Sequence, residues 1–509
     1  MQARTLGQIQ DREGLGARLR GTGRLLAAGG MVLGGALLPL GQRSLSFDEL
    51  FAAHVASLPL GELLRFVYLH DAHPPLYYLL LKAWIVAFGS GELALRTLSA
   101  VAGLVAVGAV ARLGSEASPL AGQAAALWLL SSPLFLYASV EATRYALLTA
   151  LFALAALEVL GSVLQPQRAP WRLAGLLAAL LYTHYLSGWL CVALCGFAFR
   201  HGSPAARKVF LAAAGISGLT FAPWLAVLWH HLADGRLNPP WRGPLPATLP
   251  LQILHLVGFG GRVLGTASPY LHPTAEGWVQ LLLALPVGAA VILGAGALRR
   301  ADPGLAALAA WCGGVPVAVL LGVSLWTRSL VAYPRYFVFT LPFFALAVGA
   351  AAAEGARWPW RRRALGVGAL AVLLGLRFAS LGEFAAHPTA GTGDRKALGA
   401  YLRSHVRTAD AVVVYPSWER LGLLYYAPDL RSEVVLLGTR RTVPGPDRVK
   451  REMRRLAHRE RVWVVEEPPM PPGLFAATYR RLARTHRVRE FREFEGVRVT
   501  LFVRRGGKP

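Results

Sequence analysis

Runs of about 20 apolar residues recur along this chain and limit what it can fold into more than any other feature. They extend from Leu25 to Leu381 with few charges among them, and none follows residue 383. A helix of this length crosses roughly 30 Å of hydrocarbon. Because lipid offers peptide groups no hydrogen-bond partner, a spanning segment of this kind has to be helical. The pattern therefore predicts an all-α polytopic membrane protein over most of the chain.

About eleven transmembrane helices fit these runs. Hydrophobic residues make up 54% of the chain and charged residues only 16%, and the mean hydropathy is +0.43. These values are too apolar for an ordinary soluble enzyme. We place the spans at 24–43, 74–89, 92–113, 119–139, 143–163, 172–198, 207–230, 278–298, 305–326, 333–353 and 364–382.

Clusters of Lys and Arg set the predicted orientation, because cytoplasmic loops are enriched in these residues. Such clusters precede the first span and recur at 200–208, 299–300 and 357–363, all on one side of an eleven-span topology. The predicted parts are a cytoplasmic amino terminus (1–23), a transmembrane domain (24–382) with outer loops 44–73 and 231–277, and an extracytoplasmic segment (383–509).

The segment after residue 383 has a different pattern. Helix-like stretches near 394–407, 446–459 and 474–486 alternate with short β-rich runs, which predicts a small α/β domain. This segment holds 25 Lys or Arg against 14 Asp or Glu but has no recognisable nucleic-acid motif. We therefore expect anionic membrane lipid, and not nucleic acid, beside it.

Two adjacent carboxylates, Asp48 and Glu49, open the first outer loop. One carboxylate can take the proton from an acceptor hydroxyl while that hydroxyl attacks the anomeric carbon of a sugar phosphate, and the phosphate then leaves without needing an acid. The neighbour can orient this base or help to hold a divalent cation, and the metal requirement stays open. The alternative is that both residues form the acidic first turn of a helix.

A second group of polar residues stands at the entrance of the second span. His73 and Asp71 come directly before Pro74 and Pro75, which suit the first positions of a helix. The positive end of that helix favours an anion such as a phosphate, and Asp71 can fix the tautomer of His73. The sequence 333–337, with Arg335 and Tyr336, is either a phosphate clamp with His73 or an interfacial anchor.

Further ionisable residues lie inside predicted spans, where they are costly and often functional. His184, followed by Tyr185, either lines a substrate cavity or bonds a neighbouring helix. Lys82 can snorkel or pair with a carboxylate. Glu141 and Arg144 fall at the cytoplasmic end in this topology, which favours a structural intramembrane salt bridge over an irregular fourth span.

These motifs in their order resemble the bacterial family 39-related glycosyltransferases, the superfamily of protein mannosyltransferases, aminoarabinose transferases and galacturonosyltransferases. The resemblance covers roughly residues 24 to 355. It is carried by the carboxylate pair, by His-Pro-Pro-Leu-Tyr-Tyr, by Glu-Ala-Thr-Arg-Tyr at 141–145, by Thr-His-Tyr at 183–185 and by Arg-Tyr-Phe at 335–337.

The resemblance implies a C-fold enzyme of the bacterial inner membrane that inverts the anomeric centre on the outer face. Its donor would be a polyprenyl-phosphate-linked sugar and its acceptor a lipid, glycan or protein. By position, Asp48 matches the catalytic base and Glu49 its acidic partner. His73 and Tyr336, with Arg335 beside it, match the region that binds the donor phosphate.

A transporter or flippase of a lipid-linked or glycan substrate is the main alternative function. Transporters commonly contain internal repeats and broken helices at the midplane. We find no such repeat in the sequence, and the polar residues concentrate in one outer loop. A membrane scaffold whose tail binds cell-wall polymer is a third class, in which the outer carboxylates would be incidental. Because loop variation lets one fold serve many substrates, the prediction names neither sugar nor acceptor.

Overall fold

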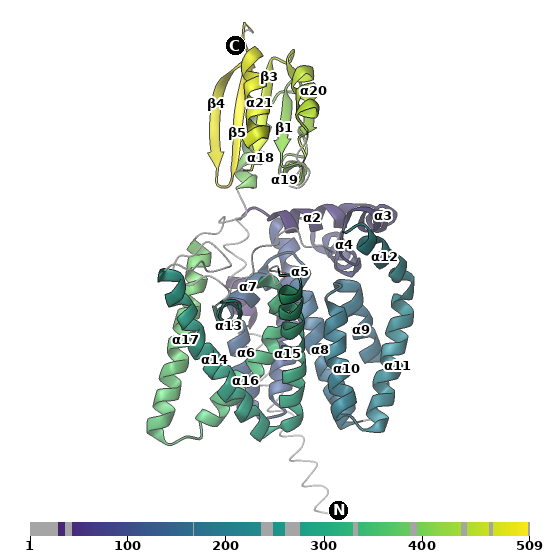
Figure 1. Ribbon diagram of the computed structural model, residues 1–509, viewed down its shortest axis with the longest axis vertical. Helices are drawn as coiled ribbons and strands as arrows, with labels where there is room; N and C mark the ends of the chain where they lie inside the picture. The colour runs from purple at the N-terminus through teal and green to yellow at the C-terminus, as the bar shows by residue number, and fades with distance from the viewer. Residues whose placement is uncertain are drawn as a thin grey trace, which may run out of the picture. The chain divides into compact units, whose positions relative to one another are not determined.

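The computed structural model describes residues 29–35, 43–165, 167–235, 248–259, 275–328, 334–386, 394–438, 445–467 and 472–506. The chain forms two compact units (Figure 1). Unit 1 consists of residues 1–38 and 58–386, and its described part is helical. Unit 2 joins residues 39–57 to residues 387–509 and contains a five-stranded sheet. The expected combination of a helical membrane part and a small α/β part is confirmed.

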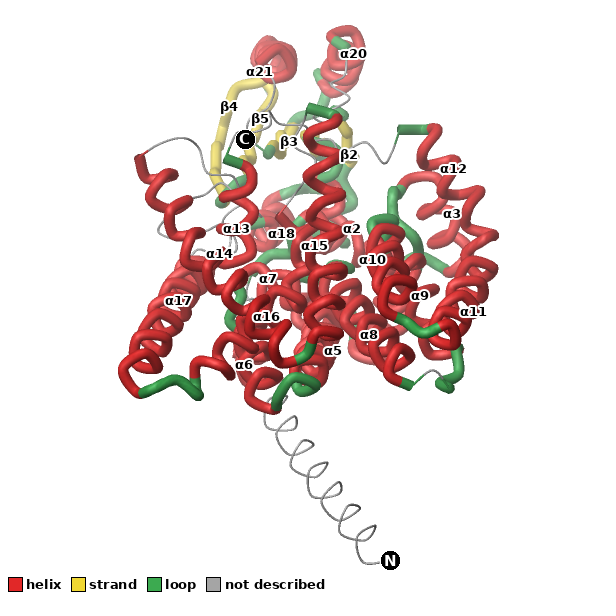
Figure 2. The backbone as a smooth tube through the Cα atoms, turned by 60° about the horizontal axis from the view of Figure 1, so that its bottom comes forward, coloured by secondary structure: helices red, strands yellow, loops and turns green. Residues whose placement is uncertain are grey.

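Seven helical stretches in the described part of unit 1 are long and apolar enough to cross a membrane, or eight if one bent pair is a single span. They include one stretch that continues from α11 through η1 into α12 (Figure 2). The seven are formed by α5 (Glu92–Gly114), α8 (Tyr145–Leu164), α11 (Pro204–Phe221) with η1 (Ala222–Trp224) and α12 (Leu225–Ala233), α14 (Ala275–Ala301), α15 (Pro303–Trp326), η2 (Pro334–Thr340) with α16 (Leu341–Gly355), and α17 (Trp360–Ala386).

Three shorter apolar helices occupy other expected spans or loops: α4 (Leu76–Phe88), α9 (Trp171–Thr183) and α13 (Leu249–Phe259). Residues 1–23, most of the first expected span and most of loop 231–277 lie outside the described residues. The expected outer loop 44–73 consists of two helices, α2 (Phe47–Ser57) in unit 2 and α3 (Leu60–His70) in unit 1.

Two of the expected straight spans are broken. The fourth bends by 68° between α6 (Pro119–Leu130) and α7 (Pro133–Val140), where Pro133 starts the second helix and Ser132 caps it. The sixth separates into α9 and α10 (Ser187–His201), because His184 between them has an extended backbone with φ −159° and ψ 138°.

Arg377 of α17 binds the end of α6 at the first break. This side chain is fully buried, and it donates hydrogen bonds to the carbonyl of Trp128, the hydroxyl of Ser131 and the carbonyls of Val257 and Gly258. Those carbonyls belong to the last turns of α6 and α13, where intrahelical partners run out and the helix dipole is negative. One cation therefore satisfies the carboxyl ends of two helices.

We predict that Arg377→Met lowers the melting temperature in detergent, whereas Arg299→Met, which changes an exposed arginine of α14, does not. Leaving buried carbonyls without donors costs on the order of 1–3 kcal/mol each. Thermal unfolding followed by retained monodisperse protein measures the difference. Equal melting of the two variants would contradict a structural role for Arg377.

Unit 2 is an α/β layer structure. Its strands are β1 (Ala411–Tyr415), β2 (Glu433–Leu436), β3 (Arg461–Glu466), β4 (His486–Phe494) and β5 (Val497–Arg504), in the spatial order β2-β1-β3-β5-β4. The strands β2, β1 and β3 are parallel, with Ala411 opposite both Glu433 and Val462, and β5 is antiparallel to β3 and β4. The helices are α18 (Arg395–His405), α19 (Glu419–Tyr426), α20 (Pro446–Leu456) and α21 (Pro472–Thr485).

Alternate residues of β1 pack on opposite faces of this sheet. Val413 and Tyr415 lie in one apolar core with residues of α20 and α21, and Val412 and Val414 lie in another with residues of α18 and α19. Both faces of the sheet are covered, as its parallel part, β2-β1-β3, requires. The two apolar cores hold the strands in place and thereby fix the positions of the loops at the strand ends.

Candidate active site

A buried carboxylate organises the entrance of α4 in unit 1. Asp71 is only 6% exposed, and its oxygens accept hydrogen bonds from the backbone of Ala72 (2.7 Å), from Nδ1 of His73 (2.9 Å) and from the hydroxyl of Tyr78 (2.5 Å). The chain leaves α3 at this residue, and Pro75 then caps α4. The predicted pairing of Asp71 with His73 is thus present at the predicted helix entrance.

The surroundings keep Asp71 ionised. Burial alone would raise the pKa of this carboxyl, but the charges of His73 and Arg144 and the hydrogen bonds from His73 and Tyr78 outweigh it and hold the pKa well below its ordinary value. Asp71 therefore carries a negative charge that fixes the orientation of the His73 ring.

Arg144 joins this cluster, contrary to the sequence-based expectation. Its guanidinium donates a hydrogen bond of 2.8 Å to the hydroxyl of Tyr78, which in turn donates to Asp71. The expectation that Glu141 and Arg144 lie at the far end of the spans was wrong, because the fourth span is not straight. Both residues stand in the connection that follows the bent pair, between the end of α7 and the start of α8.

His184 stands at the break between α9 and α10. Its Nδ1 accepts a hydrogen bond of 3.0 Å from the backbone nitrogen of Leu186, so the proton of the neutral ring must be on Nε2. The side chain is 6% exposed, and Nε2 has no hydrogen-bond partner among the described residues. A buried donor of this kind is costly unless a ligand accepts from it.

Aromatic rings surround His184. The centre of its ring lies 5.1 Å from that of His73, 6.0 Å from that of Tyr145 and 6.2 Å from that of Tyr336. Arg335 of η2 extends its guanidinium to 5.6 Å from the ring centre of Tyr145. The structure therefore brings His73, His184, Tyr336 and Arg335, predicted separately along the chain, into one cluster.

Tyr185 takes a different part in the same region. Its hydroxyl lies 2.9 Å from Nδ1 of His231 and accepts a hydrogen bond of 3.1 Å from the indole of Trp224. His231 is fully buried, and its Nε2 lies 3.0 Å from the carbonyl of Tyr68 in α3. Tyr185, in the break between α9 and α10, is thus bonded to η1 and α12, and His231 bonds α12 to α3. Lys82 donates to the carbonyl of Leu58, so it also fastens the chain beside α3.

Asp48 and Glu49 lie in the first turn of α2, in unit 2. Glu49 is 1% exposed and closes a capping box: its carboxylate accepts from the backbone of Ser46 (2.8 Å), whose hydroxyl accepts from the backbone of Glu49 (3.3 Å). Asp48 is partly exposed. The two adjacent carboxylates therefore have unequal surroundings, and both lie in the acidic first turn of a helix, as the alternative interpretation expected.

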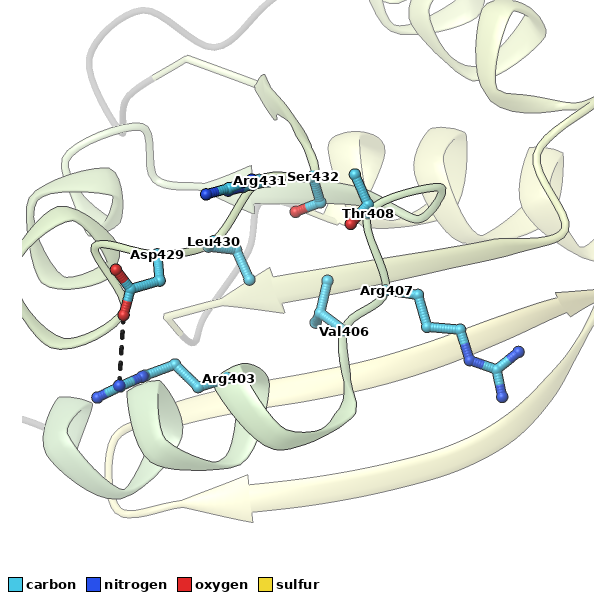
Figure 3. A pocket seen from close by; sticks show the side chains of 8 residues that line it. All are labelled: Arg403, Val406, Arg407, Thr408, Asp429, Leu430, Arg431 and Ser432. Carbon is cyan, nitrogen blue, oxygen red and sulfur yellow. Dashed lines mark hydrogen bonds and ion pairs between the residues drawn. The ribbon is translucent and has the colours of Figure 1, made fainter.

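Unit 2 also has a cavity of about 270 Å³ at the edge where β1 and β2 begin (Figure 3). Three arginines line it, but Arg403 is paired with Asp429 at 3.3 Å and Arg407 points away from the other side chains (Figure 3). It contains no histidine and no pair of carboxylates. Within the ranges that the structure describes, no three His, Cys, Asp or Glu residues come together as metal ligands.

Tyr78, Arg144 and Tyr145 are the members of the cluster that sequence reasoning did not place there. The signal available was Ser132-Pro133 within an apolar run, followed by Glu-Ala-Thr-Arg-Tyr before the next run. A proline inside such a run often ends or kinks a helix. A break at that point moves Arg144 away from the end of a straight span.

Comparison with known proteins finds a family model that matches part of this chain and solved structures that share its fold. Residues 72–228, which contain His73, Arg144 and His184 but neither Asp71 nor η2, match the family model described as dolichyl-phosphate-mannose-protein mannosyltransferase. The ArnT protein of Cupriavidus metallidurans in the apo state is similar over 94% of this chain and 97% of that chain, with 15% identity and a TM-score of 0.58. The same protein bound to undecaprenyl phosphate covers the same shares with 16% identity and a TM-score of 0.54. No curated protein sequence matches this chain.

Proposed function

We infer, from the family model that residues 72–228 match and from a fold shared with ArnT along most of the chain, that this protein is a membrane glycosyltransferase whose donor is a sugar linked to a polyprenyl phosphate. ArnT has been crystallised with undecaprenyl phosphate, which supports a lipid phosphate of that type as the donor carrier here. The single observation that carries the proposal is the cluster of cationic and aromatic side chains around Nε2 of His184, which has no hydrogen-bond partner in the part of the chain that the structure describes.

The chemistry of that cluster suits a phosphate. His73, Arg144 and Arg335 can supply positive charge, and Tyr336 adds a phenolic hydroxyl. A lipid phosphate carries negative charge and oxygens that accept several hydrogen bonds, which suits nearby cationic side chains and the buried Nε2–H of His184, a donor without a partner among the described residues. Asp71 positions His73, and Tyr78 links Asp71 to Arg144.

The proposed reaction needs one base and no acid. Asp48 accepts the proton of the acceptor hydroxyl as its oxygen forms a bond to the anomeric carbon. The bond from that carbon to the phosphate oxygen breaks, and the polyprenyl phosphate leaves as an anion. Attack from the face opposite the leaving group inverts the anomeric centre. Glu49 keeps the first turn of α2 in place through the capping box and thereby orients Asp48.

The proposed location of the reaction is the outer face of the bacterial inner membrane. The basic clusters place the amino terminus inside, and with the predicted spans they place α2, the entrance of α4 and unit 2 outside. The acceptor, whether lipid, glycan or protein, would enter from that side. The proposed domains remain a cytoplasmic amino terminus (1–23), a transmembrane part (24–382) with outer loops 44–73 and 231–277, and an extracytoplasmic part (383–509). Residues 39–57 form one compact unit with the extracytoplasmic part.

We predict that His73→Ala and Arg335→Ala each weaken the use of the donor more than they weaken folding. Losing one charged hydrogen bond costs about 1.5–3 kcal/mol, or about ten- to a hundredfold in apparent affinity. Donor titration of purified protein measures this. His201→Ala and Arg299→Ala, which change exposed residues at helix ends, are the matched controls. Unchanged donor affinity in both site variants would leave these residues as helix-entry and interfacial side chains.

We predict that Asp48→Asn abolishes most transfer while expression, detergent stability and donor binding persist. A general base contributes roughly a hundred- to ten-thousandfold, and Asn keeps the shape without the charge. Glu49→Gln is the control, since Gln also closes a capping box. The assay follows labelled sugar from a polyprenyl-phosphate donor in membranes that lack the native protein. Near-normal turnover by Asp48→Asn would place the base elsewhere, with Asp71 the next candidate.

A further inference from the structure

Unit 2 contains a place where a sheet of its kind ordinarily binds a ligand. The chain goes from β1 through α19 to β2 on one side, and from β2 through α20 to β3 on the other side of β1. Such a reversal of strand order opens a crevice beyond the carboxyl ends of the parallel strands, and ligands of open α/β sheets bind there. In this protein that edge of the sheet is formed by the ends of β1 and β3, at Tyr415 and Glu466.

Side chains at this edge form a fixed platform. Trp418, just after β1, donates a hydrogen bond of 3.0 Å to the carboxylate of Glu467, just after β3. Beside it, Arg395 at the start of α18 pairs with Glu419 at the start of α19, at 2.8 and 2.5 Å. The two paired side chains are only 5% and 1% exposed. A doubly hydrogen-bonded buried pair fixes the starts of both helices relative to each other.

The chain's own residues 44–57 pack on that platform. The hydroxyl of Ser44 donates to Asp394 (3.2 Å) and accepts from the backbone of Lys396 (3.0 Å), both at the start of α18. The backbone nitrogen of Leu45 donates to the hydroxyl of Tyr426 at 2.7 Å.

The helix α2 itself also contacts the edge of the sheet where β1 ends. The ring of Phe47 packs on that of Trp418, with 5.8 Å between their centres. Farther along α2, half-buried His54 has a lowered pKa because of burial and of the charge of Arg420 in α19.

We propose that unit 2 positions Asp48. The segment that carries this proposed base packs on the edge of the α/β sheet where ligands of such sheets ordinarily bind. This inference rests on the proposed function, because it assigns to Trp418 and Tyr426 an effect that acts through Asp48. The platform holds the residues on the amino-terminal side of Asp48 from Ser44 to Phe47, and the capping box of Ser46 and Glu49 transmits that position to the first turn of α2. Trp418 and Tyr426 are positioning residues, since Trp418 contacts Phe47 in α2 and Tyr426 bonds Leu45 just before that helix.

The experiment measures kcat and donor KM for Trp418→Ala, Tyr426→Phe and Trp418→Phe in the full-length protein. We expect Trp418→Ala to lower kcat at least tenfold with donor KM changed less than twofold, because the donor cluster belongs to unit 1. Trp418→Phe keeps a ring against Phe47 and should restore most of kcat. Tyr426→Phe removes a single hydroxyl and should lower kcat about threefold, which keeps the test decisive if Trp418→Ala unfolds. Arg431→Gln, in the cavity where β1 and β2 begin, is the control in unit 2 and should leave kcat unchanged.

Combination with Asp48→Asn separates positioning from general damage. If Trp418 acts through Asp48, Trp418→Ala lowers the residual rate of Asp48→Asn by less than twofold, since two changes in one functional unit are not additive. A further tenfold loss in that background would overturn the proposal. A normal kcat in both Trp418→Ala and Tyr426→Phe, with Asp48→Asn inactive, would also overturn the proposal. The proposed function would still stand in that case. Full activity of Asp48→Asn would instead refute the proposed base.

Discussion

In lipid, each break in a helix leaves peptide groups that water cannot reach, and this constraint determines where polar residues occur in unit 1. The break between α6 and α7 is satisfied by Arg377, whose guanidinium reaches the carboxyl ends of two helices. The break between α9 and α10 is satisfied by His184, which accepts from Leu186. Each break is thus accompanied by a polar side chain that bonds the backbone there.

The break at His184 has a chemical consequence. Because Nδ1 is occupied by the backbone, the ring presents Nε2–H to its surroundings, and those surroundings are His73, Tyr145 and Tyr336. The bend before Arg144 similarly brings a cation to Tyr78 and Asp71. The donor cluster is therefore assembled from irregular points of the backbone, and a substrate phosphate would supply an acceptor for Nε2 of His184, which has none among the described residues.

Much of the fold follows from the periodicity of the sequence. The apolar runs and the change of pattern after residue 383 predicted the helical part and the α/β part. The pairing of Asp71 with His73 followed from two prolines at a helix entrance. Sequence reasoning missed the two helix breaks inside apolar runs, because it treated Pro133 and the region of His184 as parts of straight spans. It also treated residues 44–73 as one loop, whereas the contacts of Ser44, Leu45 and Phe47 with residues of α18 and α19 depend on side chains more than 340 positions away.

The central claim is that a sugar is transferred from a lipid phosphate and not carried across the bilayer with it. The most direct measurement uses purified protein in vesicles that contain a polyprenyl-phosphate sugar and a lipid extract of the bacterial envelope. Mass spectrometry of the lipids follows both substrate and products. The account predicts that free polyprenyl phosphate appears in step with an acceptor heavier by one sugar residue. Movement of intact donor between the two leaflets, with no polyprenyl phosphate released, would contradict it and identify a flippase.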